Sequence, residues 1–171
     1  FNIGSAPFHV WLPDVYECSP LSVTSFFAIV PKIATIVMII RIYSYTFNLF
    51  FYSINNIILF SCLFSLFVGS FAAIYQHKVI RLLAYSAISH IGYILLGIFV
   101  LSIEAIDAVL LYIFLYIIMS INLYSVIISI RHLNFSVDIK YLKEFIGFFR
   151  LNPIIAFNLS IVFFSMAGIP P

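Results

Sequence analysis

The chain has 171 residues, of which 64% are hydrophobic and 8% are charged, and its formal net charge is +2. So few charged residues cannot cover a water-soluble globule, and the small positive excess does not indicate nucleic-acid binding. The composition therefore predicts an integral membrane protein without a nucleic-acid partner.

The order of apolar segments along the chain predicts a polytopic helical protein. A helix needs about 20 apolar residues to cross a bilayer. We expect the tail of one span over residues 1–10 and further spans over residues 21–45, 54–75, 82–101, 105–130 and 154–169. The last is short and ends at Pro170 and Pro171, which cannot continue a helix. Because open strands cannot cross lipid, every run predicts a helix.

The two ends of the chain lie within or beside apolar segments. Phe1 begins inside one without an initiator Met, and the chain stops after a Gly-Ile-Pro-Pro break. We expect a portion of a longer protein or a split-gene product, with partner helices that cover its flanks.

Lys and Arg are distributed unevenly between the two sides of these spans. One side carries Lys78, Arg81, Arg131, Lys140, Lys143 and Arg150, whereas the other carries Arg41. The positive-inside rule places the loops 11–20, 76–81 and 131–152 in the cytoplasm or matrix. We expect the amphipathic part of the last loop, residues 131–150, to lie along the membrane surface or against another subunit.

Lys32 stands in the middle of the first full span, directly after Pro31. A straight helix places it about 16 Å from either end, which is farther than a lysine can snorkel. A helix that ends near Pro31 would instead leave Lys32 at the interface. Charged residues at membrane depth are costly and mark proton or ion pathways, and a lysine in dry surroundings can exchange its proton near neutral pH. We interpret Lys32 as a proton relay, with water or the freed carbonyl near Pro31 as a partner.

A second polar group shares one helix face in the run 82–101. It consists of Tyr85, Ser86, Ser89, His90 and Tyr93, which follow helical spacing. Packing across helices explains such a face, and Gly92 and Gly97 would permit close approach. Histidine as a residue type titrates near neutrality, so a role of His90 as proton connector stays open beside the packing role.

The two cysteines do not indicate a bound group. Cys18 and Cys62 belong to neither a CxxC motif nor a Cys/His cluster with metal spacing. We expect inert thiols, no metal and no cofactor bound by this chain.

Four motifs resemble one protein family. Residues 6–17 read APFHVWLPDVYE and resemble the PFHxWxPDxYE signature of the subunit 2 family of respiratory NADH dehydrogenase. The stretches 31–34, 81–93 and 165–171 read PKIA, RLLAYSAISHIGY and SMAGIPP, and they follow in the family order.

The resemblance implies an antiporter-like membrane-arm subunit of complex I, in the mitochondrial inner membrane. Its helix bundle would contain discontinuous helices and a row of protonatable lysines, of which Lys32 would be the second. Residues 1–171 would form one partial transmembrane domain, with the end of one broken helix, four continuous helices and the first half of another broken helix.

The same resemblance implies a division of labour. The chain would contribute to proton translocation as part of NADH:ubiquinone reductase, while electron transfer and ubiquinone reduction belong to other subunits. Its partners would be the other membrane-arm subunits, segments supplying the missing terminal helices, and membrane lipids.

Two positions depart from the family pattern. The family lysine before the Ala-Pro-Phe-His break falls on Asn2, whose amide cannot take up a proton. Ile80 replaces a basic residue, for which we expect Lys78 to compensate.

Three functions remain open for this chain. It is a proton-translocating subunit with Lys32 as relay and His90 as connector, a structural subunit that has lost translocation, or a subunit of a related cation/proton antiporter.

Overall fold

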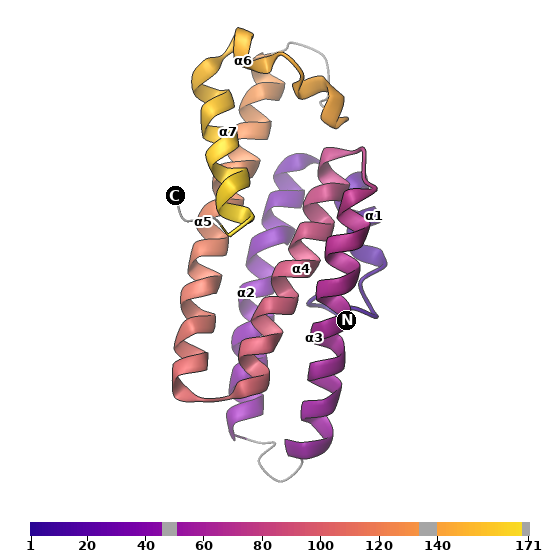
Figure 1. Ribbon diagram of the computed structural model, residues 1–171, viewed down its shortest axis with the longest axis vertical. Coiled ribbons are helices and arrows are strands. Elements are labelled where there is room, and N and C mark those ends of the chain that lie inside the picture. The colour runs from indigo at the N-terminus through magenta and orange to yellow at the C-terminus, as the bar shows by residue number, and fades with distance from the viewer. Residues whose placement is uncertain (46–50, 134–139, 169–171) are drawn as a thin grey trace.

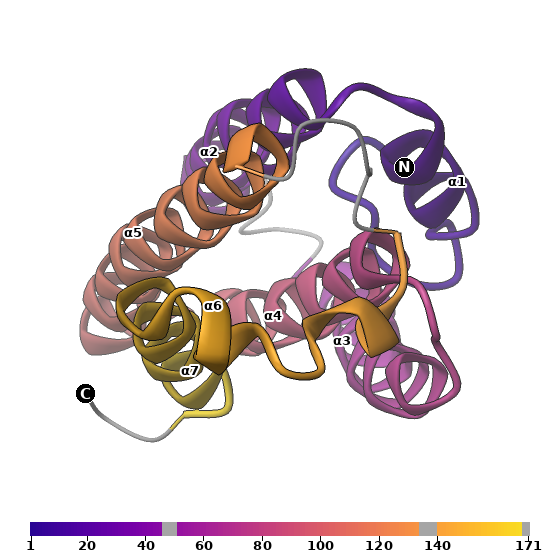
Figure 2. The same ribbon diagram turned by 90° about the horizontal axis from the view of Figure 1, so that it is seen from above.

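The computed structural model describes residues 1–45, 51–133 and 140–168. Helices account for most of these residues, and four long ones run along the long axis of the molecule (Figure 1). The elements are α1 (Trp11–Cys18), α2 (Leu21–Tyr45), α3 (Phe51–Ile74), α4 (Val79–Val100), α5 (Ile103–Leu133), the 3-10 turn η1 (Leu142–Phe145), α6 (Phe148–Leu151) and α7 (Pro153–Met166). Seen from above, α3 and α5 lie on opposite sides of α4, and α7 lies beside α5 (Figure 2).

Four of the expected spans are helices long and apolar enough to cross a membrane. They are Leu21–Tyr43, Ile54–Ile74, Val79–Val100 and Ile103–Ile130. The fifth run forms α7, whose 14 residues extend about 21 Å, less than the hydrocarbon core of about 30 Å. The all-α polytopic fold is confirmed, whereas the expected Pro-Pro break at residues 169–171 lies outside the described residues.

The N-terminal segment differs from our expectation. Residues 1–10 form turns rather than the end of a spanning helix, because Gly4 adopts a φ of +77° and Pro7 lacks a backbone donor. The segment is fixed to α3 instead: the Ala6 backbone N–H donates to Ser65 Oγ, and the Ser61 hydroxyl donates to the Ala6 carbonyl, both at 2.9 Å. The expected loop 11–20 contains the helix α1.

The alternative in which the first full span ends near Pro31 is wrong. Helix α2 continues through Pro31 to Tyr45. The Thr35 hydroxyl donates to the Pro31 carbonyl at 2.8 Å, within the same helix. Lys32 therefore lies inside the helix.

Two glycines bring α3 and α4 into close contact. A Cβ atom on Gly69 would lie 2.7 Å from the backbone N of Ser89, and one on Gly92 would lie 2.8 Å from Cγ of Leu66. Small residues allow this approach of helix backbones, and the resulting van der Waals packing helps to hold helices together in lipid. The pair fixes where α4 places its polar face.

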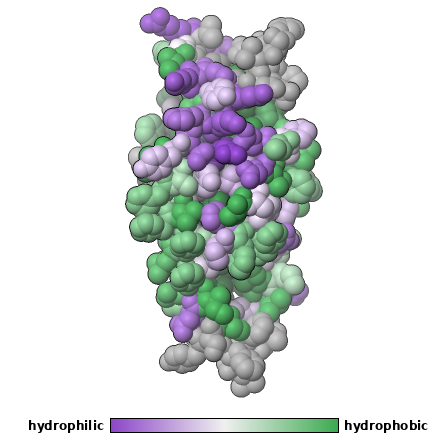
Figure 3. Space-filling view, turned by 90° about the vertical axis from the view of Figure 1, so that its right-hand side faces the viewer, coloured by the Kyte–Doolittle hydropathy of each residue, from purple (hydrophilic) through white to green (hydrophobic). Residues whose placement is uncertain are grey.

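The surface separates into a polar end and an apolar body. Figure 3 shows hydrophilic side chains gathered on the upper part of one face, with apolar side chains on its flanks and below. Helix α3 exposes Phe60, Phe64, Phe67 and Phe71, as expected for a lipid-facing or partner-facing side. The polar end contains α1, the start of α4 and residues 140–150, which carry Lys78, Arg81, Lys140, Lys143 and Arg150 of the predicted positive side. Residues 134–139 of the expected surface loop lie outside the described residues.

Candidate functional site

Lys32 lies in the interior of the bundle. Its side chain is 5% exposed, and it is the one charged residue in the buried interior of the part of the chain that the structure describes. Its Nζ donates a hydrogen bond to Oη of Tyr116 on α5, at 3.3 Å. The burial expected from the sequence is therefore observed, with a tyrosine hydroxyl as the partner.

The face of α2 that carries Lys32 explains this position. Thr24, Ala28, Lys32 and Ile36 recur every four residues and are all buried, so they form one stripe that faces the other helices. Thr24 closes the stripe at the upper end by donating to the Pro20 carbonyl at 2.8 Å.

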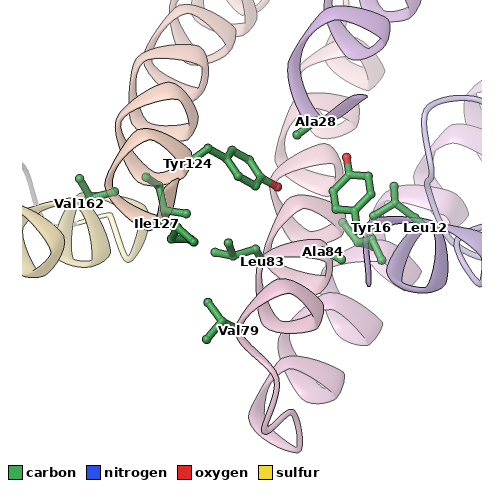
Figure 4. Close-up of a cluster of buried hydrophobic side chains, with 11 residues drawn as sticks. Leu12, Tyr16, Ala28, Val79, Leu83, Ala84, Tyr124, Ile127 and Val162 are labelled. Atoms are coloured by element: carbon green, nitrogen blue, oxygen red, sulfur yellow. The ribbon is translucent and has the colours of Figure 1, made fainter. Parts of the chain in front are cut away.

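Two aromatic rings flank the lysine amine. Nζ of Lys32 lies 5.8 Å from the ring centroid of Tyr16 and 5.5 Å from that of Tyr116. Both distances fall within the range in which a ring attracts a cation. Figure 4 shows Tyr16 reaching from α1 and Tyr124 from α5 into the same interior region. Burial raises the pKa of the Tyr16 phenol, so this ring is uncharged at physiological pH.

His90 lies on the other side of Tyr116. Its Nδ1 is 2.7 Å from Oη of Tyr112, and its ring centroid is 5.3 Å from that of Tyr116. Lys32 and His90 both line a cavity of about 10 Å³, otherwise walled mainly by isoleucines. This volume is at the lower limit for one water molecule. The structure thus brings together the two titratable residues singled out from the sequence.

The tyrosines of α5 were missed by the sequence reasoning. Tyr112, Tyr116 and Tyr124 follow a spacing of four and eight residues, with Ser120 between them. That spacing places them on one helix face. The same rule that found the polar face around His90 would have found this one.

The other candidate residues do not join this group. Asn2 is exposed, in a turn closed by the Gly4 N–H and the Phe1 carbonyl at 3.0 Å, and it does not line the cavity beside Lys32. The hydroxyls of Ser86 and Ser89 donate to carbonyls of their own helix, at 2.8 and 2.7 Å. The polar face of α4 is therefore not one continuous network.

The residues of the 6–17 motif make a charged latch at the polar end. We use this name for Asp14 and Glu17 of α1 together with Lys78 and Arg81 at the start of α4. Glu17 accepts hydrogen bonds from both Lys78 and Arg81, and Arg81 also reaches Asp14 at 2.8 Å. The hydrogen bond from Lys78, and then that from Arg81, lower the pKa of Glu17. Lys78 thus supplies a second basic partner near Ile80, and Arg81 holds α1 in place.

The cysteines are separate from this site. The Cys62 thiol donates to the Gly92 carbonyl at 3.1 Å, and Cys18 is exposed. Within residues 1–45, 51–133 and 140–168, no group of three or more His, Cys, Asp or Glu side chains is placed to hold a metal ion.

Comparison with known proteins gives matches over the whole chain. The family model described as "NADH:quinone oxidoreductase/Mrp antiporter, TM" matches residues 1–171. NADH-ubiquinone oxidoreductase chain 2 of Marchantia polymorpha is 42% identical over 171 residues, which are 100% of this chain and 34% of that protein. NADH-quinone oxidoreductase subunit N of Paramagnetospirillum magneticum is 39% identical over 100% of this chain and 35% of that protein. The chain spans about a third of the length of these relatives.

Two solved structures share the fold. A chain of respiratory complex I from Thermus thermophilus with bound aureothin is 27% identical, with a TM-score of 0.78 over 99% of this chain and 36% of that one. A chain of the membrane-bound sulfane sulfur reductase, an archaeal respiratory membrane complex, has a TM-score of 0.86 over 97% of this chain and 34% of that one. Its identity of 21% supports a likeness of fold alone.

Proposed function

This chain belongs to the NADH:quinone oxidoreductase/Mrp antiporter transmembrane family, and we propose on that basis that it forms part of a membrane-arm subunit of respiratory complex I. The family resemblance drawn from the sequence motifs is thereby confirmed. The proposed partners are the other membrane-arm subunits, membrane lipids, and further helices that complete the bundle, in the same protein or in a neighbouring chain. The proposed location is the mitochondrial inner membrane, and the chain 2 relatives from plants support this proposal.

The proposed task of the chain is redox-coupled proton translocation through Lys32. The observation that carries this proposal is a lysine amine buried between helices, with a hydrogen bond to Tyr116 and no carboxylate among the residues that line its cavity. A buried amine without a countercharge is costly in its charged form. A small change in its surroundings can therefore shift its proton occupancy, as a relay requires.

His90 is the proposed proton carrier next to Lys32. Its ring lies beside Tyr116, which also accepts the hydrogen bond from Lys32, so one phenol links the lysine to the imidazole; Nδ1 of His90 contacts Tyr112. A single water in the cavity that Lys32 and His90 share would complete the contact. The neutral imidazole has one donor and one acceptor nitrogen, which suits transfer between partners on either side.

A structural subunit without translocation is the second candidate, and Asn2 is the observation that favours it. The resemblance places a family lysine at this position, but the amide here lies in an exposed turn and cannot titrate. Under this reading the chain keeps its helix contacts and its latch while the protons pass elsewhere.

The two candidates are separated by removing the amine. We expect Lys32→Ala to lower proton transport per NADH oxidised in sealed vesicles, while the complex still assembles. Thr24→Ala is the matched control, since it changes a buried residue on the same stripe of α2 that does not line the cavity beside Lys32, and it leaves the amine in place. Equal proton transport in wild type and Lys32→Ala would favour the structural reading.

A further inference from the structure

Helix α1 packs against α4 at the edge of the bundle (Figure 2), and its Tyr16 ring lies near the buried lysine. Leu12 and Tyr16 are each 1% exposed, and they pack with Ala28 of α2 and Ala84 of α4 in the cluster shown in Figure 4. The carboxylates on the opposite side of α1 bind Lys78 and Arg81. One short helix thus has an outer side held by ion pairs and an inner side that reaches Lys32.

Tyr16 meets the lysine with its ring and not with its hydroxyl. The ring centroid lies 5.8 Å from Nζ, whereas Oη of Tyr16 is buried and makes no hydrogen bond within the described structure. An unpaired buried hydroxyl costs free energy that phenylalanine would avoid. The contact that Tyr16 offers the ammonium is therefore the negative face of its π-system.

We infer that Tyr16 and Tyr116 form an aromatic enclosure that stabilises the charged form of Lys32, and that α1 is held by its latch in order to position the Tyr16 ring. This inference rests on the proposed relay role of Lys32 and assigns a positioning role to a residue of the 6–17 motif. Tyr116 contributes both its ring, at 5.5 Å, and its hydroxyl, at 3.3 Å. Tyr16 contributes its ring alone.

Few polar groups other than these two rings surround Lys32. The titratable residues that face Lys32 in the described part of the chain are Tyr16 from α1, His90 from α4 and Tyr116 from α5. Tyr112 lies behind His90. A carboxylate that would neutralise the ammonium is not among the described residues that touch it, so the rings replace one.

The difference between ring and hydroxyl gives a direct test in the intact respiratory complex. Proton transport per NADH oxidised is measured against pH in sealed vesicles for Tyr16→Phe and Tyr16→Leu. Leucine keeps the site apolar but removes the π-face, so Lys32 loses its charge more readily. The alkaline midpoint is the pH at which proton transport falls to half of its maximum as the pH rises. We expect this midpoint to lie about 0.5 to 1.5 pH units lower in Tyr16→Leu than in the wild type. In Tyr16→Phe we expect the wild-type midpoint. Equal midpoints in the two variants would overturn the inference.

If the complex with Tyr16→Leu does not assemble, a pair of variants at Tyr116 tests the aromatic enclosure instead. At Tyr116, phenylalanine removes the hydrogen bond and keeps the ring, whereas leucine removes both. We expect a lower midpoint in Tyr116→Leu than in Tyr116→Phe, and equal midpoints would again contradict the enclosure. Lys32→Ala is the reference variant. If it transports protons like the wild type, the proposed relay role of Lys32 fails. If it loses proton transport while Tyr16→Leu and Tyr16→Phe give the same pH profile, only the aromatic enclosure is refuted.

Discussion

A methyl group added at Gly69 should destabilise the subunit, because the contact between α3 and α4 leaves no room for it. Gly69→Ala places a Cβ atom 2.7 Å from the backbone N and 2.9 Å from Cα of Ser89, where ordinary contact begins at 3.4 Å. The obstacle is backbone, which cannot rotate away, so the helices must separate by roughly 0.7 Å or more locally. Overpacking of this kind costs about 1–3 kcal/mol. Because Ser89 precedes His90, the shift also disturbs the contact of His90 with Tyr112.

The assay is unfolding of the solubilised full-length subunit by SDS, together with proton transport by the assembled complex. Gly92→Ala should cost less than Gly69→Ala, because its two nearest neighbours are side-chain atoms of Leu66, which can adjust. Ser70→Ala is the control, since Ser70 is exposed and its hydroxyl bonds only to its own helix, and we expect a change below about 0.5 kcal/mol. Equal stability of Gly69→Ala and Ser70→Ala would refute the close-contact argument.

Three further predictions concern the latch, α7 and the imidazole. The pKa of Glu17 is lowered, so its contribution to α1 docking is present above the ordinary carboxyl value of about 4.3 and is lost as the pH falls through the lowered one. A fluorophore on exposed Cys18 should therefore become more mobile in strong acid, and already at neutral pH in Glu17→Gln; unchanged anisotropy in that variant would contradict the latch. Asn122 and Asn158 exchange hydrogen bonds of 3.1 and 3.3 Å between α5 and α7. Either Asn→Leu change should destabilise the subunit by about 0.6–1.7 kcal/mol in SDS unfolding, and the double change by less than the sum of the two; strict additivity would argue against the pair. His90→Gln should reduce proton transport less than loss of the lysine does, and wild-type rates would return the imidazole to a packing role.

The spans could be predicted because lipid leaves the backbone few alternatives. A run of about 20 apolar residues must become a helix, and the four long helices begin and end within a few residues of the expected positions. Helix α1 carries no such signal. Its eight residues include Pro13 and two carboxylates, and it is stabilised by burial of Leu12 and Tyr16 and by ion pairs to α4. These contacts are distant in sequence, so no local pattern reports them.

The sequence predicted individual residues of the candidate site but not how the fold brings them together. Lys32 and His90 each stand out within one helix, as a charge in an apolar run and as part of a polar face. Their meeting depends on α5, whose tyrosines at 112 and 116 reach the two residues separately. The spacing of those tyrosines is visible in the sequence, but the rotation that turns them toward Lys32 is set by packing between helices. Asn2 shows the reverse case: the resemblance places it where the family has a lysine, but it lies in the exposed turn of residues 1–4 and does not line the cavity beside Lys32.

The ratio of protons translocated to electrons passed, measured in sealed vesicles for variants of Lys32, tests the relay role most directly. Lys32→Ala removes the titratable amine, and Lys32→Arg keeps a positive charge that cannot be released in proteins. If Lys32 is a proton relay, the ratio should be lower in both variants, with assembly and NADH oxidation retained. An unchanged ratio in Lys32→Arg would show that the buried residue does not need to release its proton, and it would refute the relay role.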